Sequence, residues 1–525
     1  MPPSVESAMV STIYSAALNG IDAFIVSVEA SRLTKNNDGF NNEIYIIGLP
    51  DAAVRESIGR VRAAASSAGY KLPGGNSTVN LAPADRKKEG SGFDLPIFLS
   101  LVKGMLFEDV DLSGCCFVGE LSLTGAIRPV RGALSMALEA KTAGLREIYV
   151  PAENAAEASA ASGIDVYPVS NLVELYEHLR GIKRIVSKTF SFETLRTETL
   201  LRELDYADVK GQETAKLALE TAAAGQHNVL LIGPPGSGKS MLASRLPSIL
   251  PELTLEEAIE TTRIHSIAGT LPPETPLIVG RPFRAPHHTM SYAGLAGGGK
   301  VPIPGEISIA HNGVLFLDEL PEFDKNILEV LRQPVEEHQI TITRVNGKYT
   351  FPAAFMLVCA MNPCKCGYYG SKNKECTCSD IARHGYISKI SGPLLDRIDI
   401  QVEVPALDYN KLSSPVLAES SAVIRKRVGE ARQFALERFR ADNQVITGNG
   451  MMKAAHIRKY CILDDAAGQT VKAAFDKLGL SARGYDRLLK LSRTLADFEK
   501  SEVIKREHVL IAVRLRSLDR KYWNK

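Results

Sequence analysis

The sequence has no apolar run of roughly 20 residues, the length that spans a bilayer. Its start, MPPSVESAMV, also lacks the basic segment and following apolar block of a secretory signal. Both absences argue against a membrane-embedded or secreted protein. We therefore expect a cytoplasmic protein without a membrane partner.

Cysteine is scarce for a chain of this length, and charge of neither sign dominates. Four of the eight cysteines crowd into residues 364–378, which argues against a disulfide framework and for a reducing compartment. The formal net charge is +2, so any surface for nucleic acid has to be local rather than a global basic field. Internal repeats and low-complexity tracts are also absent.

The chain is long enough for about three domains of ordinary size. Residues 9–182 alternate short β-branched runs, such as DAFIVSVEA and EIYVPAEN, with Ala-rich helical stretches, which predicts an α+β or α/β domain. We interpret the polar stretch 183–200 as a linker. Residues 201–408 show the strand-then-helix pattern of a parallel nucleotide-binding sheet.

Strand signals nearly vanish over residues 409–520, which predicts a small all-helical domain. Within AVIRKRVGEARQFALERF the apolar residues recur at helical spacing on one stripe. They are Ile424, Val428, Ala431, Ala435 and Phe439.

Residues 229–240 read VLLIGPPGSGKS, an apolar run that enters a glycine-rich turn and ends in Lys-Ser. The pattern G-x-x-x-x-G-K-[ST] lets backbone N–H groups wrap phosphates, while the lysine reaches the outer phosphates and the hydroxyl ligates Mg²⁺. The alternative is an ordinary glycine turn. The predicted ATP-binding residues are Gly233, Pro234, Pro235, Gly236, Ser237, Gly238, Lys239 and Ser240.

A second motif, VLFLDE, places two acidic residues after a short apolar strand. We predict that Asp318 holds the magnesium ion and that Glu319 polarises the attacking water. The alternative is a strand that ends in a solvated acidic turn.

The two motifs resemble those of the ring-forming AAA+ ATPases. The resemblance implies that Asn362, at the end of FMLVCAMN, senses the γ-phosphate. It also implies that Arg397, in SGPLLDRIDI, is an arginine finger that reaches a neighbour's nucleotide. Arg483, in SARGYDRLL, resembles the second sensor of a helical lid, and DYADVKGQ, with Val209, resembles the segment that packs on the adenine.

The alternative for Arg397 is an ion pair with Asp396 or Asp399. A finger that acts in trans implies an oligomer, and the usual arrangement in the AAA+ ATPases is a hexameric ring.

A β-hairpin is expected within EEHQITITRVNGKYTFPA, from alternation on both sides of Asn346-Gly347. It places Arg344 and Lys348 near the tip. The hairpin resembles the pre-sensor hairpin of the MCM helicases and of magnesium chelatase, which in the helicases contacts DNA in the ring channel. The alternative is a solvated hairpin with ordinary basic residues.

A second candidate for binding DNA is the stretch GRPFRAPHHTMSYAGLAGGGKVPIPGE, residues 280–306. Arg281, Arg284 and Lys300 supply positive charge, and aromatic residues there would stack on bases. The adjacent His287 and His288 could form a metal pair, but neighbouring side chains on a loop are expected to point apart. We therefore expect no metal there.

The cysteines of NPCKCGYYGSKNKECTCSD suit a structural zinc site. Cys364, Cys366, Cys376 and Cys378 form two C-x-C pairs, a less common spacing than C-x₂-C. The alternative is a loop of reduced cysteines that bind no metal, and the lysines of the loop also make it a candidate DNA contact.

Residues 119–144, GELSLTGAIRPVRGALSMALEAKTAG, resemble the proteolytic domain of the Lon protease, which uses a Ser-Lys dyad. In that resemblance the lysine position falls at Met136 and the serine position at Gly92, with Ser91 one residue away. Methionine cannot take a proton from a serine. We expect no peptidase activity and a role in ring assembly or DNA handling.

Together, RPFRAPHHTMSYAGLAGGG, NGVLFLDELPEF and SGPLLDRIDI closely resemble the ComM/YifB family of magnesium-chelatase-like AAA+ ATPases. The resemblance implies a hexameric, ATP-driven helicase that promotes DNA branch migration in recombination or natural transformation. Two alternatives are a metal-insertion subunit like that of magnesium chelatase and an ATPase that remodels proteins.

Overall fold

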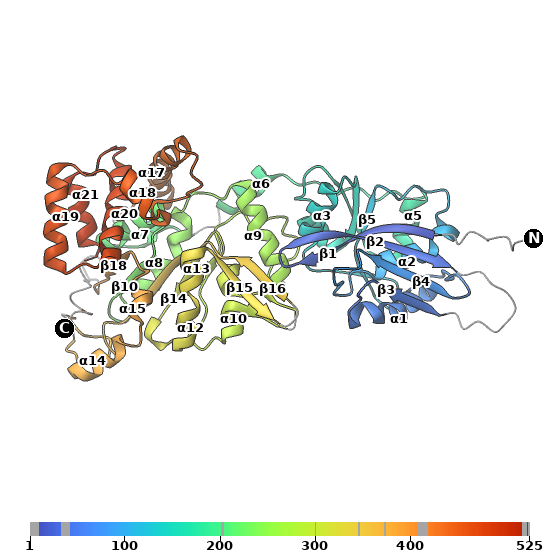
Figure 1. Ribbon diagram of the computed structural model, residues 1–525, viewed down its shortest axis with the longest axis horizontal. Helices are drawn as coiled ribbons and strands as arrows, with labels where there is room; N and C mark the ends of the chain where they lie inside the picture. Colours follow the sequence, from blue (N-terminus) through green and yellow to red (C-terminus); the bar gives the residue numbers. More distant parts are fainter. Residues whose placement is uncertain are drawn as a thin grey trace, which may run out of the picture. The chain divides into compact units, whose positions relative to one another are not determined.

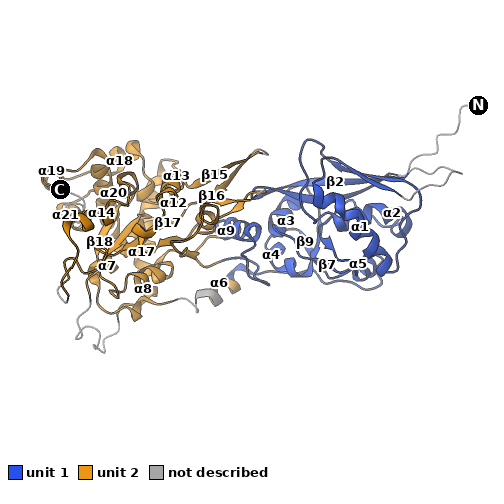
Figure 2. Ribbon diagram, turned by 90° about the horizontal axis from the view of Figure 1, so that it is seen from below, with its two compact units in different colours: residues 1–194, 255–278 blue, residues 195–254, 279–525 orange. Residues whose placement is uncertain are grey.

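The computed structural model describes residues 10–32, 43–200, 204–299, 301–344, 347–371, 374–406, 418–516 and 522. The chain divides into two compact units (Figure 2). The first comprises residues 1–194 and 255–278, and the second residues 195–254 and 279–525. Each unit has a sheet and a hydrophobic core of its own.

The first unit contains a mixed sheet of seven strands in the order β3-β4-β2-β1-β5-β8-β9 (Figure 1). β1 pairs antiparallel with β2, and β2 antiparallel with β4, whereas the other neighbouring pairs are parallel. This confirms the expected mixture of α and β structure. The strands are β1 (Val10–Asn19), β2 (Asp22–Arg32), β3 (Ile44–Ile47), β4 (Ser77–Ala82), β5 (Cys115–Phe117), β8 (Glu147–Pro151) and β9 (Asp165–Val169), with the separate pair β6 (Glu120–Leu121) and β7 (Ile127–Arg128).

Helices α1 and α2 of this unit are joined by a buried ion pair. Asp94 accepts from Arg60 Nε at 2.6 Å and Nη2 at 2.9 Å, a two-pronged contact that satisfies both carboxylate oxygens. The hydrogen bonds to Asp94 raise the pKa of Arg60. The helices are α1 (Ala52–Ser67), α2 (Asp94–Leu106), α3 (Ala133–Thr142), α4 (Ala155–Ala158), α5 (Leu172–Leu179) and α9 (Leu255–Ala268).

Helix α9 belongs to the first unit although it lies far along the chain. Arg263 donates to the Ile21 carbonyl at 2.8 Å, and the backbone N–H of Gly132 donates to the Ser266 hydroxyl at 2.9 Å. The segment 201–408, expected as one domain, is therefore divided between the two units. The polar stretch 183–200, expected as a linker, ends in a helix, α6 (Phe192–Leu200).

The second unit contains a five-stranded, all-parallel sheet in the order β11-β14-β17-β10-β18, which confirms the parallel sheet predicted there. The strands are β10 (Val229–Ile232), β11 (Phe283–Arg284), β14 (Val314–Leu317), β17 (Met356–Met361) and β18 (Ile400–Glu403), with two separate pairs, β12 (Gly297–Gly298) with β13 (Ile303–Pro304) and β15 (Gln339–Arg344) with β16 (Gly347–Pro352). Around them lie α7 (Glu213–Gly225), α8 (Lys239–Arg245), α10 (Tyr292–Ala296), α11 (Glu306–Ile309), α12 (Lys325–Val330), α13 (Arg332–Glu337), α14 (Asp380–Ile387) and α15 (Gly392–Leu395).

The C-terminal part of the second unit is helical over the described residues, as expected (Figure 1). All five residues of the predicted stripe are buried on α17 (Ser421–Ala441). The other helices are α18 (Ala454–Tyr460), α19 (Asp465–Leu478), α20 (Ala482–Phe498) and α21 (Arg506–Arg514). We call α17–α21 the helical region.

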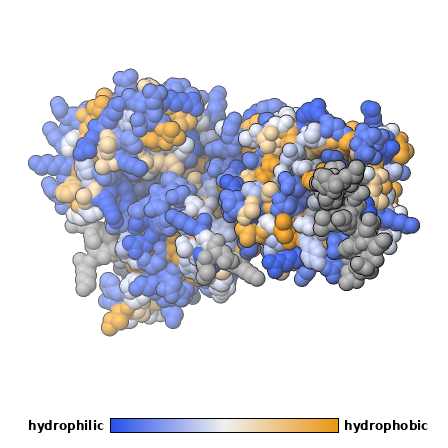
Figure 3. Space-filling model, turned by 45° about the vertical axis from the view of Figure 1, so that its right-hand side comes forward, coloured by the Kyte–Doolittle hydropathy of each residue, from blue (hydrophilic) through white to orange (hydrophobic). Residues whose placement is uncertain are grey.

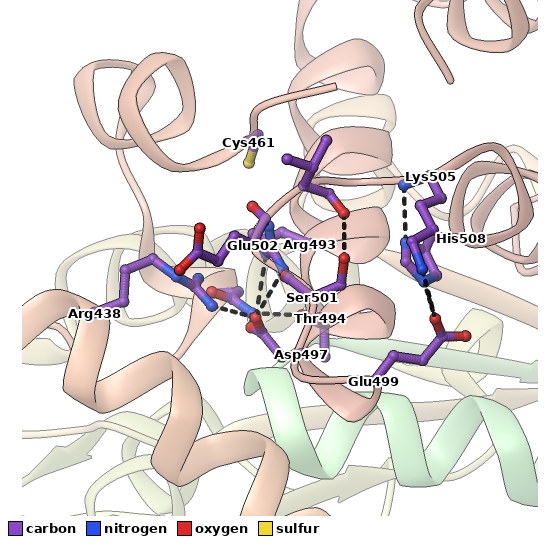
Figure 4. A network of polar contacts seen from close by, with 12 residues as sticks. Arg438, Cys461, Arg493, Thr494, Asp497, Glu499, Ser501, Glu502, Lys505 and His508 are labelled. Carbon is purple, nitrogen blue, oxygen red and sulfur yellow. Dashed lines mark hydrogen bonds and ion pairs between the residues drawn. The ribbon is translucent and has the colours of Figure 1, made fainter. Parts of the chain in front are cut away.

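Polar contacts hold the helical region together from within (Figure 4). Asp497 on α20 accepts from Arg493 at 3.1 Å and from Asn449 at 2.7 Å, and it also pairs with Arg438 of α17. Burial raises the pKa of Asp497, although both guanidinium groups favour the charged carboxylate. The two guanidinium groups and the Asn449 amide together offset part of the cost of burying this carboxylate.

No helix among the described residues is long and apolar enough to cross a membrane. Hydrophilic residues cover much of the face drawn in Figure 3, and apolar residues lie between them in small groups.

A buried carboxylate joins the parallel sheet to the helical region. Asp399, just before β18, lies 3.5 Å from His227 Nδ1 and 3.5 Å from Nε of Arg487 on α20. His227 Nε2 in turn lies 2.8 Å from the hydroxyl of Thr494 on α20. Although desolvation opposes ionisation, His227, Arg487 and Lys490 together lower the pKa of Asp399 to about 2.

We predict that Asp399→Asn destabilises the protein at neutral pH by on the order of 2 kcal/mol, since each pKa unit corresponds to about 1.4 kcal/mol. A carboxyl with a depressed pKa contributes stability above its unfolded pKa, and that contribution is lost as pH falls. The difference from wild type should therefore shrink between about pH 4 and pH 2. Urea denaturation at several pH values measures it, with the exposed Asp476→Asn as control. A difference that does not change with pH would contradict the role of this carboxylate.

Candidate functional site

The glycine-rich loop lies between β10 and α8, as its sequence predicts. β10 is buried throughout, and the chain turns sharply after it. Gly233 has no room for a side chain, because a Cβ would lie 2.1 Å from the Val404 carbonyl oxygen. Gly238 has a φ of 91°, a left-handed conformation that favours glycine. These two positions let the backbone curl tightly before Lys239.

Lys239 lies under this loop and reaches the next strand. Its Nζ donates to the carbonyls of Gly233 at 2.8 Å and Pro234 at 2.9 Å, and to Oδ1 of Asn362 at 3.2 Å. Desolvation lowers the pKa of Lys239, and the carboxylates of Asp318 and Glu319 oppose that shift. The structure therefore brings together the lysine of the glycine-rich loop and the asparagine at the end of β17.

The acidic pair lies at the end of β14, beside the same loop. The Ser240 hydroxyl donates to Asp318 Oδ2 at 2.7 Å, so the two predicted magnesium ligands are in direct contact. Glu319 has a φ of 52°, which is uncommon for a residue with a side chain, and its carboxylate is 55% exposed. The turn directs one acid toward Ser240 and leaves the other accessible to solvent.

The predicted arginine finger, Arg397, and the predicted second sensor, Arg483, each lie close to an acidic side chain. Arg397 pairs with Glu336 of α13 at 2.7 Å and not with Asp396 or Asp399, the two partners considered from the sequence. Its side chain is 10% exposed. Arg483, at the start of α20, is 62% exposed and lies 3.7 Å from Asp396.

The segment expected to pack on the adenine lies inside the core. Val209 is 4% exposed and belongs to the main hydrophobic cluster of the second unit. The side chain of Gln212, three residues after Val209, donates to the carbonyls of Ser237 at 3.1 Å and Pro405 at 2.7 Å. This side chain ties the segment to the glycine-rich loop.

The predicted hairpin is present as β15 and β16. Arg344 pairs with Gly347 and Thr343 with Lys348 at its end, and both basic side chains are exposed. Asn346, at the predicted tip, lies outside the described residues. The hairpin lies against β12, because a Cβ on Gly298 would come 3.3 Å from Arg344 Nη2. The hairpin therefore lies beside the stretch of residues 280–306, to which β12 belongs and which we call the insert.

Two basic residues of the insert are bound within the fold. Arg281 donates to the carbonyls of Pro251, Asn312 and Glu252 at 2.7–3.2 Å. Arg284 makes a two-pronged pair with Glu306, both contacts at 2.6 Å, and this hydrogen bonding raises its pKa. The third residue, Lys300, lies outside the described residues.

The adjacent histidines do not point apart, contrary to the expectation from the sequence. The ring centroids of His287 and His288 lie 4.1 Å apart, because the turn that follows β11 folds one ring over the other. His288 Nδ1 is 3.7 Å from the Glu319 carboxylate. The pair therefore lies beside the acidic turn.

The four clustered cysteines converge. Their sulfur atoms all lie within 4.8 Å of one another, close enough to hold a metal ion. Backbone N–H groups, and the thiols of Cys364 and Cys378, lower the pKa of Cys366 to about 6 against the opposing effect of desolvation. A thiolate is the form that binds metals.

The residues compared with the Ser-Lys dyad lie in the first unit. Met136 is buried on α3, and the Ser91 hydroxyl donates to Glu120. Gly92 accepts a backbone hydrogen bond from Gly119 at 2.9 Å.

Three contacts at the site were not expected from the sequence. The hydroxyl of Tyr386 lies near the backbone N–H of Asn362, Glu336 pairs with Arg397, and Gly367 packs on Pro235. Only Gly367 carries a local signal, since the C-x-C-G pattern hints at a tight turn. The other two partners are distant in sequence.

Three protein-family models match consecutive stretches of the chain. "Subunit ChlI of Mg-chelatase" matches residues 34–154, "Magnesium chelatase, subunit ChlI" residues 205–412, and "Magnesium chelatase, subunit ChlI C-terminal" residues 418–516. The central match indicates an ATPase.

The similar proteins include two that are matched over almost their whole length. The YifB protein of Escherichia coli is 40% identical and the competence protein ComM of Haemophilus influenzae 41% identical, each over 515 residues that cover 97% of both chains. The 38 kDa subunit of magnesium chelatase from Cereibacter sphaeroides is 24% identical over 328 residues, which cover 58% of this chain and 88% of that subunit.

We predict that Glu319→Gln keeps nucleotide affinity but slows ATP hydrolysis by on the order of 10²–10⁴-fold, because an amide cannot take the proton of the attacking water. Fluorescent-nucleotide binding and phosphate release measure the two quantities separately. Glu322→Gln, on the same turn, is the matched control and should hydrolyse ATP like wild type. Normal turnover in Glu319→Gln would show that another group activates the water.

Proposed function

The chain belongs to the YifB/ComM family of magnesium-chelatase-like proteins, and we propose that it is an ATP-driven DNA motor. In this proposal it is a hexameric helicase of the AAA+ type that promotes branch migration in recombination or natural transformation. The name of the Haemophilus influenzae relative, a competence protein, supports the biological setting. A motor that acts on chromosomal DNA with cellular ATP would work in the cytoplasm.

The observation that carries the proposal is the convergence of Lys239, Asp318 and Asn362 at one sheet edge. Lys239 would bind the outer phosphates, and Ser240 with Asp318 would hold Mg²⁺, which offsets phosphate charge when bound. Glu319 would orient a water molecule and take its proton. Val209 would lie behind the base rather than on the surface, since its side chain is in the core.

The ring would be completed by arginines that respond to nucleotide. Arg397 would leave Glu336 to reach the neighbour's phosphates, and Arg483 would extend from the helical region toward its own subunit's nucleotide. Glu336 lies on α13, only three residues before β15 begins. Exchange of this ion pair would therefore couple the nucleotide of one subunit to the hairpin of the next.

The proposed DNA contact is the surface formed by the hairpin and the adjoining insert. Arg344 and Lys348 supply exposed positive charge, and Tyr292, 55% exposed on α10, can stack on a base. Arg281 and Arg284 are not included, because carbonyl and carboxylate groups of the fold occupy their guanidinium groups.

The first unit is proposed to have a Lon-protease-like fold that serves assembly or DNA handling. Met136 occupies the position of the dyad lysine and is buried, so Ser91 has no base from that position. The four cysteines are proposed to hold a structural zinc ion, since four protein ligands leave no open position for a reacting water.

A metal-insertion subunit is the second candidate function, because all three matching family models carry the name of magnesium chelatase. A protein remodeller is a third, supported by Tyr292, an exposed aromatic residue at the start of α10, because rings of that kind grip polypeptide with aromatic side chains. Adding four-way DNA, casein or a porphyrin to an ATPase assay separates the three. We expect four-way DNA to stimulate ATP hydrolysis, and casein and the porphyrin to leave its rate unchanged.

We predict that Arg344→Ala weakens DNA binding about tenfold and lowers the salt slope of binding by about 1, because one phosphate contact is lost. Basal ATP hydrolysis should remain, while its stimulation by DNA falls. Arg458→Ala, an exposed arginine on α18, is the control and should behave like wild type. Unchanged affinity and stimulation in Arg344→Ala would rule out the hairpin contact.

A further inference from the structure

The cysteine loop, residues 364–378, starts two residues after Asn362, at the carboxyl end of β17. Three sulfur–sulfur distances are 3.3 Å between Cys364 and Cys366, and 3.6 Å from each of them to Cys376. Tetrahedral zinc with bonds of about 2.3 Å would set its ligands roughly 3.8 Å apart. The observed spacing fits one ion at the centre, and it is too small to enclose a multi-iron cluster.

The outer contacts of this cluster orient its sulfur atoms. The backbone N–H of Tyr369 donates to Cys364 Sγ at 3.4 Å. The guanidinium of Arg383, on α14, makes a cation–π contact with the ring of Tyr369, 4.4 Å from the ring centroid. Contacts of this kind commonly fix the ligands of a metal site from outside.

The cysteine loop packs directly on the phosphate-binding loop. A Cβ on Gly367 would lie 2.6 Å from Pro235 Cδ and 2.8 Å from Pro235 Cγ. The same Cβ would lie 3.9 Å from Asn362 Cγ. Gly367 therefore fits against both the loop that would hold the phosphates and the residue that would sense them.

Asn362 is held from a second side by the helix that follows the cysteines. Its backbone N–H lies near the hydroxyl of Tyr386, a buried residue of α14, and its side-chain Oδ1 accepts a hydrogen bond from Lys239 Nζ at 3.2 Å. Gly367 of the cysteine loop thus lies against the side chain of Asn362, and Tyr386 of α14 lies near its backbone. The cysteine cluster joins these two segments.

We propose that a zinc ion held by Cys364, Cys366, Cys376 and Cys378 locks Gly367 and Tyr386 against the phosphate site, so that ATP turnover depends on the metal. Without the ion, no common ligand holds the four thiols together and the cysteine loop is free to open. Pro235 and Asn362 then lose their packing against Gly367. Nucleotide affinity and hydrolysis then fall while the rest of the fold persists. This inference rests on the proposed ATPase activity but not on the DNA contact.

The test compares the full-length wild type with Cys376→Ser/Cys378→Ser, Gly367→Ala and Gly479→Ala. Gly479 matches Gly367 in its left-handed backbone, with φ of 62° against 85°, but a Cβ there meets no atom within 4 Å. Zinc content, fluorescent-nucleotide affinity, basal ATP hydrolysis without DNA and thermal unfolding are measured for each. Wild type is also measured after zinc is withdrawn with a thiol reagent and chelator.

We expect about one zinc ion per chain in wild type. The double cysteine variant and the stripped wild type should lose zinc and at least about tenfold in turnover, a factor that corresponds to a modest misplacement of the site. Gly367→Ala should keep zinc and lose turnover to a similar extent, and Gly479→Ala should keep both.

Wild-type turnover in a folded, zinc-free protein would overturn the inference, as would wild-type protein purified without zinc. Turnover unaffected by Gly367→Ala would overturn the packing route. If zinc is bound and needed for hydrolysis but DNA does not stimulate the protein, the DNA-motor proposal fails and this inference stands. If wild type hydrolyses no ATP, the proposed function fails and nucleotide affinity alone decides the inference.

Discussion

The organisation of the second unit depends on one constraint, that parallel strands end at the same edge of their sheet. β10 has β17 on one side and β18 on the other, and β14 lies beyond β17. The residues that follow β10, β14 and β17 therefore meet at this edge. The contacts of Lys239 with Asn362 and of Ser240 with Asp318 follow from that arrangement, which brings side chains together from three distant stretches of sequence.

The same edge explains why two further features, the cysteine loop and the histidine turn, lie beside this site. The cysteine loop continues from β17 and the histidine turn follows β11, so both start at this edge. The segment with Arg397 instead leads into β18, and in an all-parallel sheet it therefore lies toward the opposite edge. Asp399 then links this segment to α20, which begins next to Arg483. Each element that would sense nucleotide is thus a continuation of a strand or is tied to one by buried charge.

Local patterns predicted much of this from the sequence. The glycine-rich loop, the hairpin between β15 and β16, the stripe on α17 and the convergence of the cysteines depend on residues close together in the chain, where spacing carries the information. The family resemblance added Asn362, Arg397 and Arg483, whose catalytic roles remain predictions.

The contacts between residues that are far apart in the chain could not be predicted from the sequence. Nothing local distinguishes Arg397 paired with Glu336 from Arg397 paired with Asp396 or Asp399, because several acids lie within reach of a long side chain. Likewise, Arg281 and Arg284 look like exposed phosphate ligands until their carbonyl and carboxylate partners are seen. The turn after β11 also brings the rings of His287 and His288 together, with their planes tilted by 33°, against the simple rule for neighbouring side chains.

The most direct test of an ATP-driven DNA motor is the mass of the purified full-length protein with Mg-ATP and a four-way DNA junction, combined with its rate of ATP hydrolysis. The predicted result is a hexamer on the junction, with hydrolysis faster than in the absence of DNA. A protein that stays monomeric with ATP and DNA, and hydrolyses ATP at a rate that DNA does not change, would contradict it.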